Sequence, residues 1–132
     1  MQKADTPIQS GSSEPAVRER EVLRNALIRL SKILHLSRIQ MCAILGMSEA
    51  SASRFFHGQR MINPHSKEGE LALLLLHLYR SLAALLGSQE APCRDWLHGY
   101  NTYFNAAPIE VIQRVQGLID VINYLDAMRG KI

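Results

Sequence analysis

The chain of 132 residues has few aromatic residues, only two cysteines and no alternating apolar and polar run long enough for a strand. Aromatic residues make up 6% of the sequence, a content that points away from β-rich and sugar-binding architectures. Apolar residues recur instead at helical spacing along most of the chain. We therefore predict an all-α fold, with an N-terminal helix-turn-helix unit followed by a small helical C-terminal unit.

The sequence also lacks the motifs of metal binding and catalysis. Cys42 and Cys93 have no CxxC or histidine partner at ligand spacing, which fits a reducing cytoplasmic compartment. No glycine-rich phosphate loop follows a strand, and no serine lies in a GxSxG motif. The N-terminal segment lacks the apolar core of a signal peptide. We expect no enzyme, no cofactor and no metal, since the five histidines also lack HxxxH spacing: His35, His57, His65, His77 and His98.

Charge is divided unequally between the two halves of the chain. Residues 1–67 hold ten Lys or Arg and five Asp or Glu, a balance of +5, whereas residues 68–132 hold five and seven, a balance of −2. The two sum to the net charge of +3. A basic front half supplies the nonspecific attraction to phosphate that DNA binding needs, so the acidic back half has another role.

The stretch from Leu36 to Arg60 has the spacing of a helix-turn-helix. Gly46 suits the turn, where a positive φ costs glycine little, and Cys42 is small enough for the second helix to approach. Ser37 and Ser48 precede the two helical patterns and can cap them. The predicted inward set is Met41, Leu45, Met47, Ala52 and Phe55.

The exposed face of the second helix carries short polar groups and a guanidinium, which suit a DNA major groove. An ordinary helical hairpin is the alternative to a DNA reader. We expect Arg54 to reach a base, and Arg60 and Lys67 to contact phosphates as Arg38 does. The predicted DNA-binding residues are Arg38, Gln40, Ser48, Glu49, Ala50, Ser51, Ser53, Arg54 and Arg60.

Three units follow from the pattern: a flexible arm over residues 1–15, the helix-turn-helix unit over 16–63, and a long apolar helix with the C-terminal unit over 64–132. Helical periodicity starts near Ala16, with Val22 on the apolar stripe and Arg24 opposite it. The long helix ends at Gly87, and its apolar run, Leu71–Leu86, is shorter than the ~20 residues of a membrane span. Because it is apolar around most of its circumference, either the C-terminal region or a second copy must cover it, and we predict a homodimer.

Further helices are expected after the long helix. One surrounds Arg94–Leu97 after a loop over residues 88–92, another begins at Pro108, and Gly117 interrupts it before a final amphipathic helix. Trp96, the single tryptophan, is expected to anchor the core of the C-terminal unit. His77 is expected to be a hydrogen-bonded interior or interface residue.

The first half of the chain resembles the Xre family of phage-repressor-like helix-turn-helix domains. The matching residues are Leu36-Ser37-Arg38, Met41-Cys42, Leu45-Gly46-Met47-Ser48 and Ser53-Arg54-Phe55. Cys42 and Ala52 depart from the alanine and the β-branched residue usual there. The segment Trp96–Gly130 resembles the toxin-binding domain shared by Xre, MbcA and ParS antitoxins. The matching residues are Trp96-Leu97, Asn101, Phe104, Pro108-Ile109-Glu110-Val111-Ile112, Gly117, Val121 and Leu125.

The resemblance implies an antitoxin of a type II toxin–antitoxin pair. Toxins of this group carry a RES domain and act on NAD, and the antitoxin covers the NAD pocket and represses the shared operon. A stand-alone dimeric helix-turn-helix regulator without a toxin is the alternative, which a RES-type protein encoded by the adjacent gene would exclude. We expect Asp126, Arg129 and Lys131 to lie free at the chain end for the toxin's cleft. The predicted toxin-binding residues are Trp96, Asn101, Phe104, Asp126, Arg129 and Lys131.

Overall fold

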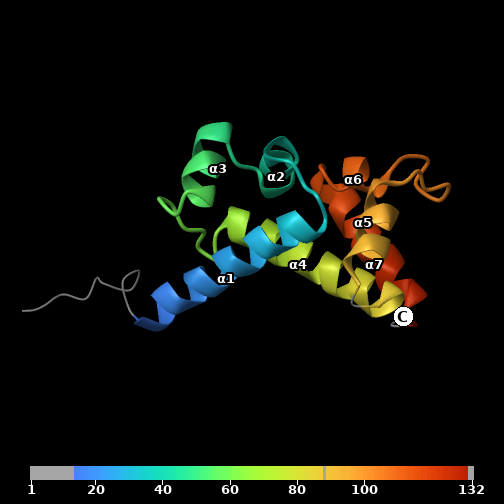
Figure 1. Cartoon of the computed structure of the whole chain (residues 1–132), viewed down its shortest axis with the longest axis horizontal. Coiled ribbons are helices and arrows are strands. Elements are labelled where there is room, and N and C mark those ends of the chain that lie inside the picture. Colours follow the sequence, from blue (N-terminus) through green and yellow to red (C-terminus); the bar gives the residue numbers. More distant parts are fainter. Residues whose placement is uncertain (1–13, 88, 131–132) are drawn as a thin grey trace, which may run out of the picture.

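The computed structural model describes residues 14–87 and 89–130, and within these ranges it is all-helical, as predicted. Two long helices lie along the molecule, with α2 and α3 above one end and α5, α6 and α7 gathered at the other (Figure 1). The helices are α1 (Glu14–Ile33), α2 (Arg38–Leu45), α3 (Glu49–Phe56), α4 (Lys67–Leu86), α5 (Glu90–His98), α6 (Pro108–Val111) and α7 (Val115–Met128). The predicted arm lies outside the described residues, except for Glu14 and Pro15, which begin α1.

Helix α4 connects the two ends of the molecule because it packs on α1 and α2 and also on α5 and α7. Its core face repeats every three or four residues, at Ala72, Leu75, Leu78 and Leu82, all of which are fully buried. By length and composition α4 could cross a membrane, with a mean hydropathy of 1.4, but core helices of folded proteins meet the same test. Its buried face and four packing partners make it the central core helix of this fold.

Serine side chains cap helices α2, α3 and α4, as predicted for Ser37 and Ser48. The Ser37, Ser48 and Ser66 hydroxyls accept hydrogen bonds from the backbone N–H groups three residues later, at 3.0, 3.1 and 3.0 Å. Gly46 ends α2 with a φ of 69°, in the left-handed region. The turn between α2 and α3 is therefore fixed by local chemistry.

The structure corrects two helix starts. Helix α1 begins at Glu14, and Val22, expected on its apolar stripe, is 61% exposed because it faces away from the core. Helix α5 begins at Glu90 and not near Arg94, so the expected loop reaches only to Gln89. Pro92 lies within the first turn of α5, where a missing N–H removes no helical hydrogen bond.

Gly117 does not interrupt a helix, contrary to the prediction. The break lies at Ile112–Arg114, and Gly117 is buried in the first turn of α7. A Cβ at this position would lie 1.9 Å from the Val111 carbonyl oxygen. Glycine is needed there because the end of α6 and the start of α7 approach each other too closely for any side chain.

Candidate functional site

Helices α2 and α3 form the predicted helix-turn-helix. The five residues predicted to face inward, Met41, Leu45, Met47, Ala52 and Phe55, are all buried. Cys42 is buried as well, and its thiol lies 3.7 Å from the Ser48 carbonyl oxygen, which it faces across the turn. Burial and the Glu49 carboxylate raise the pKa of Cys42, so this thiol is a packing group and not a nucleophile.

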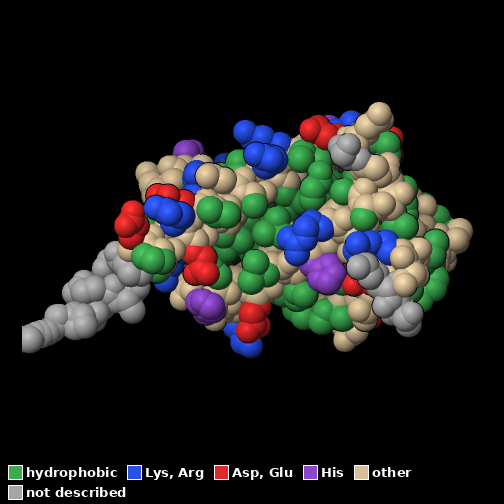
Figure 2. All heavy atoms as spheres, turned by 90° about the horizontal axis from the view of Figure 1, so that it is seen from below, with side chains coloured by type: hydrophobic (Ala, Val, Ile, Leu, Met, Phe, Trp, Pro, Cys, Tyr) green, Lys and Arg blue, Asp and Glu red, His purple; other side chains and the backbone are tan. Residues whose placement is uncertain are grey.

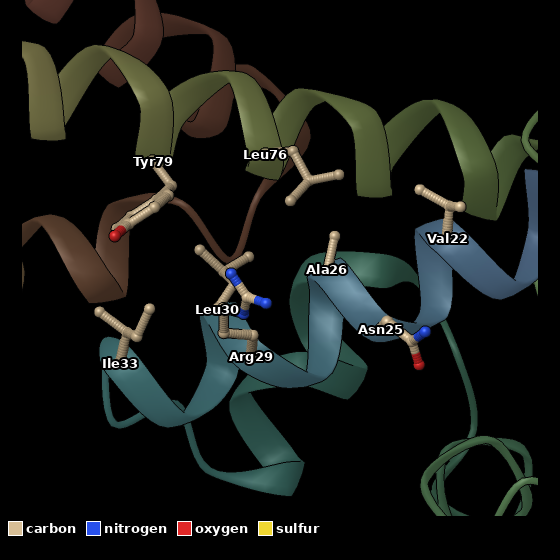
Figure 3. Close-up of a pocket in the computed structure, with 8 residues that line it drawn as sticks. All are labelled: Val22, Asn25, Ala26, Arg29, Leu30, Ile33, Leu76 and Tyr79. Carbon is tan, nitrogen blue, oxygen red and sulfur yellow. The ribbon is translucent and has the colours of Figure 1, made fainter.

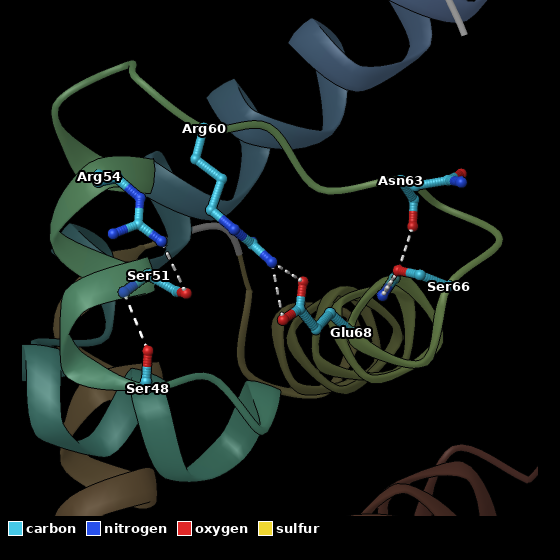
Figure 4. A network of polar contacts seen from close by, with 8 residues as sticks. Ser48, Ser51, Arg54, Arg60, Asn63, Ser66 and Glu68 are labelled. Atoms are coloured by element: carbon cyan, nitrogen blue, oxygen red, sulfur yellow. Dashed lines mark hydrogen bonds and ion pairs between the residues drawn. The ribbon is translucent and has the colours of Figure 1, made fainter.

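The outer face of α3 is polar and lacks large side chains. Glu49, Ala50 and Arg54 are exposed, and Ser51 and Ser53 are half-buried. The Arg54 guanidinium donates to the Ser51 hydroxyl at 3.3 Å, one turn back along the helix (Figure 4). Arg38, exposed at the start of α2, lies with its guanidinium 5.9 Å from the centre of the Phe56 ring. The face thus presents two cations beside small polar groups.

Gln40, Ser48 and Arg60, which were also predicted to bind DNA, are instead engaged in structural contacts within the chain. The Ser48 hydroxyl caps α3, and the Gln40 side-chain oxygen accepts from the Ser37 N–H at 2.8 Å, completing a capping box. Arg60 donates from one nitrogen to both oxygens of Glu68, at 2.8 and 3.0 Å (Figure 4). These side chains stabilise the unit that presents α3.

Sequence reasoning missed Arg24, which it placed on the solvent side of α1. The Arg24 guanidinium donates to the carbonyl oxygens of Phe55 and Phe56 at 2.9 and 3.0 Å, and lies 5.8 Å from the centre of the Phe55 ring. Both carbonyls lie at the end of α3, where the Phe55 oxygen also accepts from the Gly58 N–H at 3.1 Å and where a cation is favoured by the helix dipole. Because the contact joins residues more than thirty positions apart, no local signal could have revealed it.

Asp126 and Arg129 are not free at the chain end, contrary to the prediction. Asp126 accepts from the Ser81 hydroxyl at 2.6 Å and pairs with the His77 ring at 3.0 Å, and Arg129 donates to Ser81 at 2.9 Å. The hydrogen bond from Ser81, then the charges of His77 and Arg129, hold the pKa of Asp126 below its usual value against the effect of burial. The four side chains fasten α7 to α4, and His77 is hydrogen-bonded as predicted. Lys131 lies outside the described residues.

Trp96 and Phe104 belong to an aromatic cluster that also contains Tyr103 and Tyr124. Trp96 is half-buried and stacks on Tyr124 with ring centres 6.3 Å apart. Tyr103, Phe104 and Tyr124 contact one another with ring centres between 4.6 and 5.2 Å apart. The cluster joins α5, the loop after it and α7, so Trp96 anchors this unit as expected, although at its edge.

Asn101 organises the loop that carries Tyr103 and Phe104. Its side-chain oxygen accepts from the backbone N–H groups of Tyr103 and Phe104 at 2.8 and 3.4 Å. Its own backbone pairs with that of Ala106 through two hydrogen bonds. The asparagine side chain therefore fixes the conformation of the loop.

No metal-binding cluster of His, Cys, Asp or Glu occurs among the described residues.

Two family models match the chain. Residues 15–77 match the antitoxin Xre-like helix-turn-helix domain, and residues 81–131 match the antitoxin Xre/MbcA/ParS C-terminal toxin-binding domain. No curated protein matches the chain. Neither domain family is enzymatic in general, and the helical fold of the described residues gives no catalytic sign. The chain thus joins an Xre-like helix-turn-helix domain to an Xre/MbcA/ParS toxin-binding domain, the two domains of a type II antitoxin.

Proposed function

We propose that this antitoxin acts in the cytoplasm, neutralises a RES-type toxin that consumes NAD by covering its active site, and represses its own operon. The observation that carries the proposal is the pairing of the two matched domains in one chain. Their candidate surfaces lie at opposite ends of the molecule, with α3 at one end and the loop after α5 at the other (Figure 1). Operator DNA and toxin could therefore be bound together.

For the DNA surface, we propose that Arg54 contacts a base edge and that Arg38 contacts phosphate. Glu49, Ala50, Ser51 and Ser53 would complete the contact from the same face of α3. The polar groups that already have internal partners would hold this face in position. Gel-shift titration on the DNA upstream of the gene tests the assignment, and equal affinity for random DNA at every salt concentration would contradict it.

We also propose a homodimer, formed over the groove between α1 and α4. Val22 and Leu73 are 61% and 48% exposed, and hydrophobic side chains gather along the middle of the face seen in Figure 2. The close-up in Figure 3 shows Val22, Ala26 and Leu30 of α1 opposite Leu76 and Tyr79 of α4. Burying this surface in a second copy would stabilise the pair by about 25 cal/mol per Å² of apolar area.

The oligomeric state is tested by light scattering coupled to size-exclusion chromatography. The double variant Val22→Glu, Leu73→Glu should give the mass of a single chain, because two exposed apolar residues of the groove become charged. Ile39→Glu serves as the control, since Ile39 is an exposed apolar residue of α2 outside the groove. A dimer that survives the double substitution would place the contact elsewhere.

For neutralisation, we propose that the toxin contacts lie in the C-terminal unit, with Trp96, Asn101 and Phe104 near one edge and Lys131 at the chain end. Truncation after Leu125 should release toxin activity, but it also removes Asp126 and with it the contacts that hold α7 on α4. Deletion of residues 131–132 alone is the sharper test, because it leaves those contacts in place.

The decisive experiment is co-expression with the protein encoded beside this gene. If that protein is a RES-type toxin, the full chain should restore growth and co-purify with it, and cellular NAD should recover. A variant that lacks residues 81–132 should lose both effects. Failure of the full chain to bind the neighbouring protein would instead favour the stand-alone regulator.

A further inference from the structure

The outer surface of the C-terminal unit carries a hollow of about 720 Å³. Four of its lining residues follow one face of α7 at the spacing i, i+3, i+4 and i+7: Asp120, Asn123, Tyr124 and Ala127. Tyr103, Phe104 and Met128 complete it. Tyr103 and Met128 are 70% and 60% exposed, so two large and largely exposed side chains border the same hollow.

The aromatic side of this hollow is rigid before any partner binds. Tyr103 contacts both Phe104 and Tyr124, and the loop that carries it is closed by the Asn101–Ala106 backbone pair. The Tyr100 hydroxyl also donates to the side chain of Asn105, whose own backbone φ is 58°. A surface held in this way loses little entropy on binding, which is the property of an interaction hot spot.

The charge of the hollow selects a cationic occupant. Within residues 14–87 and 89–130, Asp120 is the one charged residue that lines the hollow, and no Lys or Arg lines it. Asp120 is exposed, and the Gln116 amide donates to its carboxylate at 2.8 Å. A guanidinium or ammonium group placed here would pair with the carboxylate and lie against the electron-rich faces of Tyr103 and Tyr124. The acidic balance of residues 68–132 favours the same sign of partner.

We infer that this hollow, which we call the Tyr103–Asp120 surface, receives an arginine or lysine side chain from a basic, partly apolar segment of the toxin. The inference rests on the proposed antitoxin function and names the chemistry of the partner segment. The surface lies at the end of the molecule opposite α3, so a toxin bound there leaves the DNA-facing helix open (Figure 1).

The test uses the full chain and the purified toxin encoded beside its gene, with affinity measured by isothermal titration calorimetry. Asp120→Lys and Tyr103→Ala should each weaken binding by about tenfold or more, whereas Tyr103→Phe, which keeps the ring, should stay within about twofold. Glu21→Lys is the matched control, because it makes the same charge change at an exposed position of α1. Among toxin variants, an Arg→Glu or Lys→Glu substitution in the docking segment should restore binding to Asp120→Lys.

The outcomes separate this inference from the function on which it rests. If the wild-type chain binds the toxin and the Asp120→Lys and Tyr103→Ala variants bind it with the same affinity as the wild type, the inference is overturned and the antitoxin function is left intact. A wild-type chain that does not bind would overturn both. A change in the mass of the free chain on Tyr103→Ala would identify a contact between copies and also overturn the inference. Circular dichroism checks that the variants remain folded.

Discussion

The two ends of the molecule differ in the side chains that they expose and in the contacts that hold those side chains in place. At the helix-turn-helix end, short polar side chains on α3 are exposed, and serine caps and a glycine turn fix the backbone locally. At the other end, the exposed ring of Tyr103 on a loop contacts the half-buried ring of Tyr124 on α7, and contacts between distant segments hold this region in place. The comparison indicates how one small chain can bind two macromolecules. Each surface has its own supports, and α4 is the element that they share.

The largest loss of stability is expected when a side chain is added to a glycine that lies against the backbone of another segment. In Gly117→Ala the new Cβ would lie 1.9 Å from the Val111 carbonyl oxygen, and in Gly69→Ala it would lie 2.2 Å from the Asn63 carbonyl oxygen. Each should lower the free energy of unfolding by about 3 kcal/mol, because backbone must move. Chemical denaturation gives the loss, and gel shift and toxin binding show which end fails.

Gly117→Ala should impair toxin binding more than DNA binding, and Gly69→Ala should do the reverse. Gly99→Ala is the milder comparison, because φ is −86° there and a new Cβ would lie 3.0 Å from the Asp95 carbonyl oxygen, so a smaller shift would relieve the contact. If both variants lost both activities equally, the two ends would not be separately supported.

Arg54→Ala should weaken binding to the operator by roughly 1–3 kcal/mol, because it removes the base-reaching guanidinium of α3. Its unfolding free energy and its toxin affinity should stay unchanged, since Arg54 is exposed and far from the C-terminal unit. Arg38→Ala should instead reduce the salt dependence of binding with little change in sequence preference. Fluorescence anisotropy at several salt concentrations measures both, and identical behaviour of the two variants would remove the proposed division of roles.

Asp126→Asn should lower the free energy of unfolding by about 1.5 kcal/mol at neutral pH, because a half-buried, charged hydrogen-bond acceptor is lost. The folded pKa of Asp126 lies below its unfolded value, so its contribution is fully present above about pH 5. It declines as the pH falls through the folded pKa, and wild type and variant should converge in acid. A stability difference that persisted at low pH would mean that packing and not charge joins α7 to α4.

The smallest effect is expected for Arg24→Met, which removes the two hydrogen bonds to the end of α3 and keeps much of the aliphatic packing. The free energy of operator binding should weaken by about 1 kcal/mol, which is about fivefold in affinity, because α3 is held in place less firmly. Arg20→Met on the same helix is the control for charge. An equal loss in both variants would show that only the net charge matters.

Sequence reasoning succeeded where structure depends on neighbours along the chain. The caps at Ser37 and Ser48, the left-handed Gly46 and the five inward residues of the helix-turn-helix all occur as predicted. Each depends on propensity or spacing within a few residues. The same reasoning misread Gly117 as a helix break, because a glycine that ends a helix and one that admits a close backbone look alike in a sequence.

The fold class, the order of the two units and the local geometry of the DNA-facing helix were determined by the sequence itself, because helical periodicity and caps act over a few residues. The supports of both surfaces were decided by tertiary structure. Arg24 reaches α3 across the fold, and His77 and Ser81 of α4 bind Asp126 of α7 from more than forty residues away. Such contacts depend on how α1 and α7 pack against α4, and periodicity records which residues face inward but not which partners they meet.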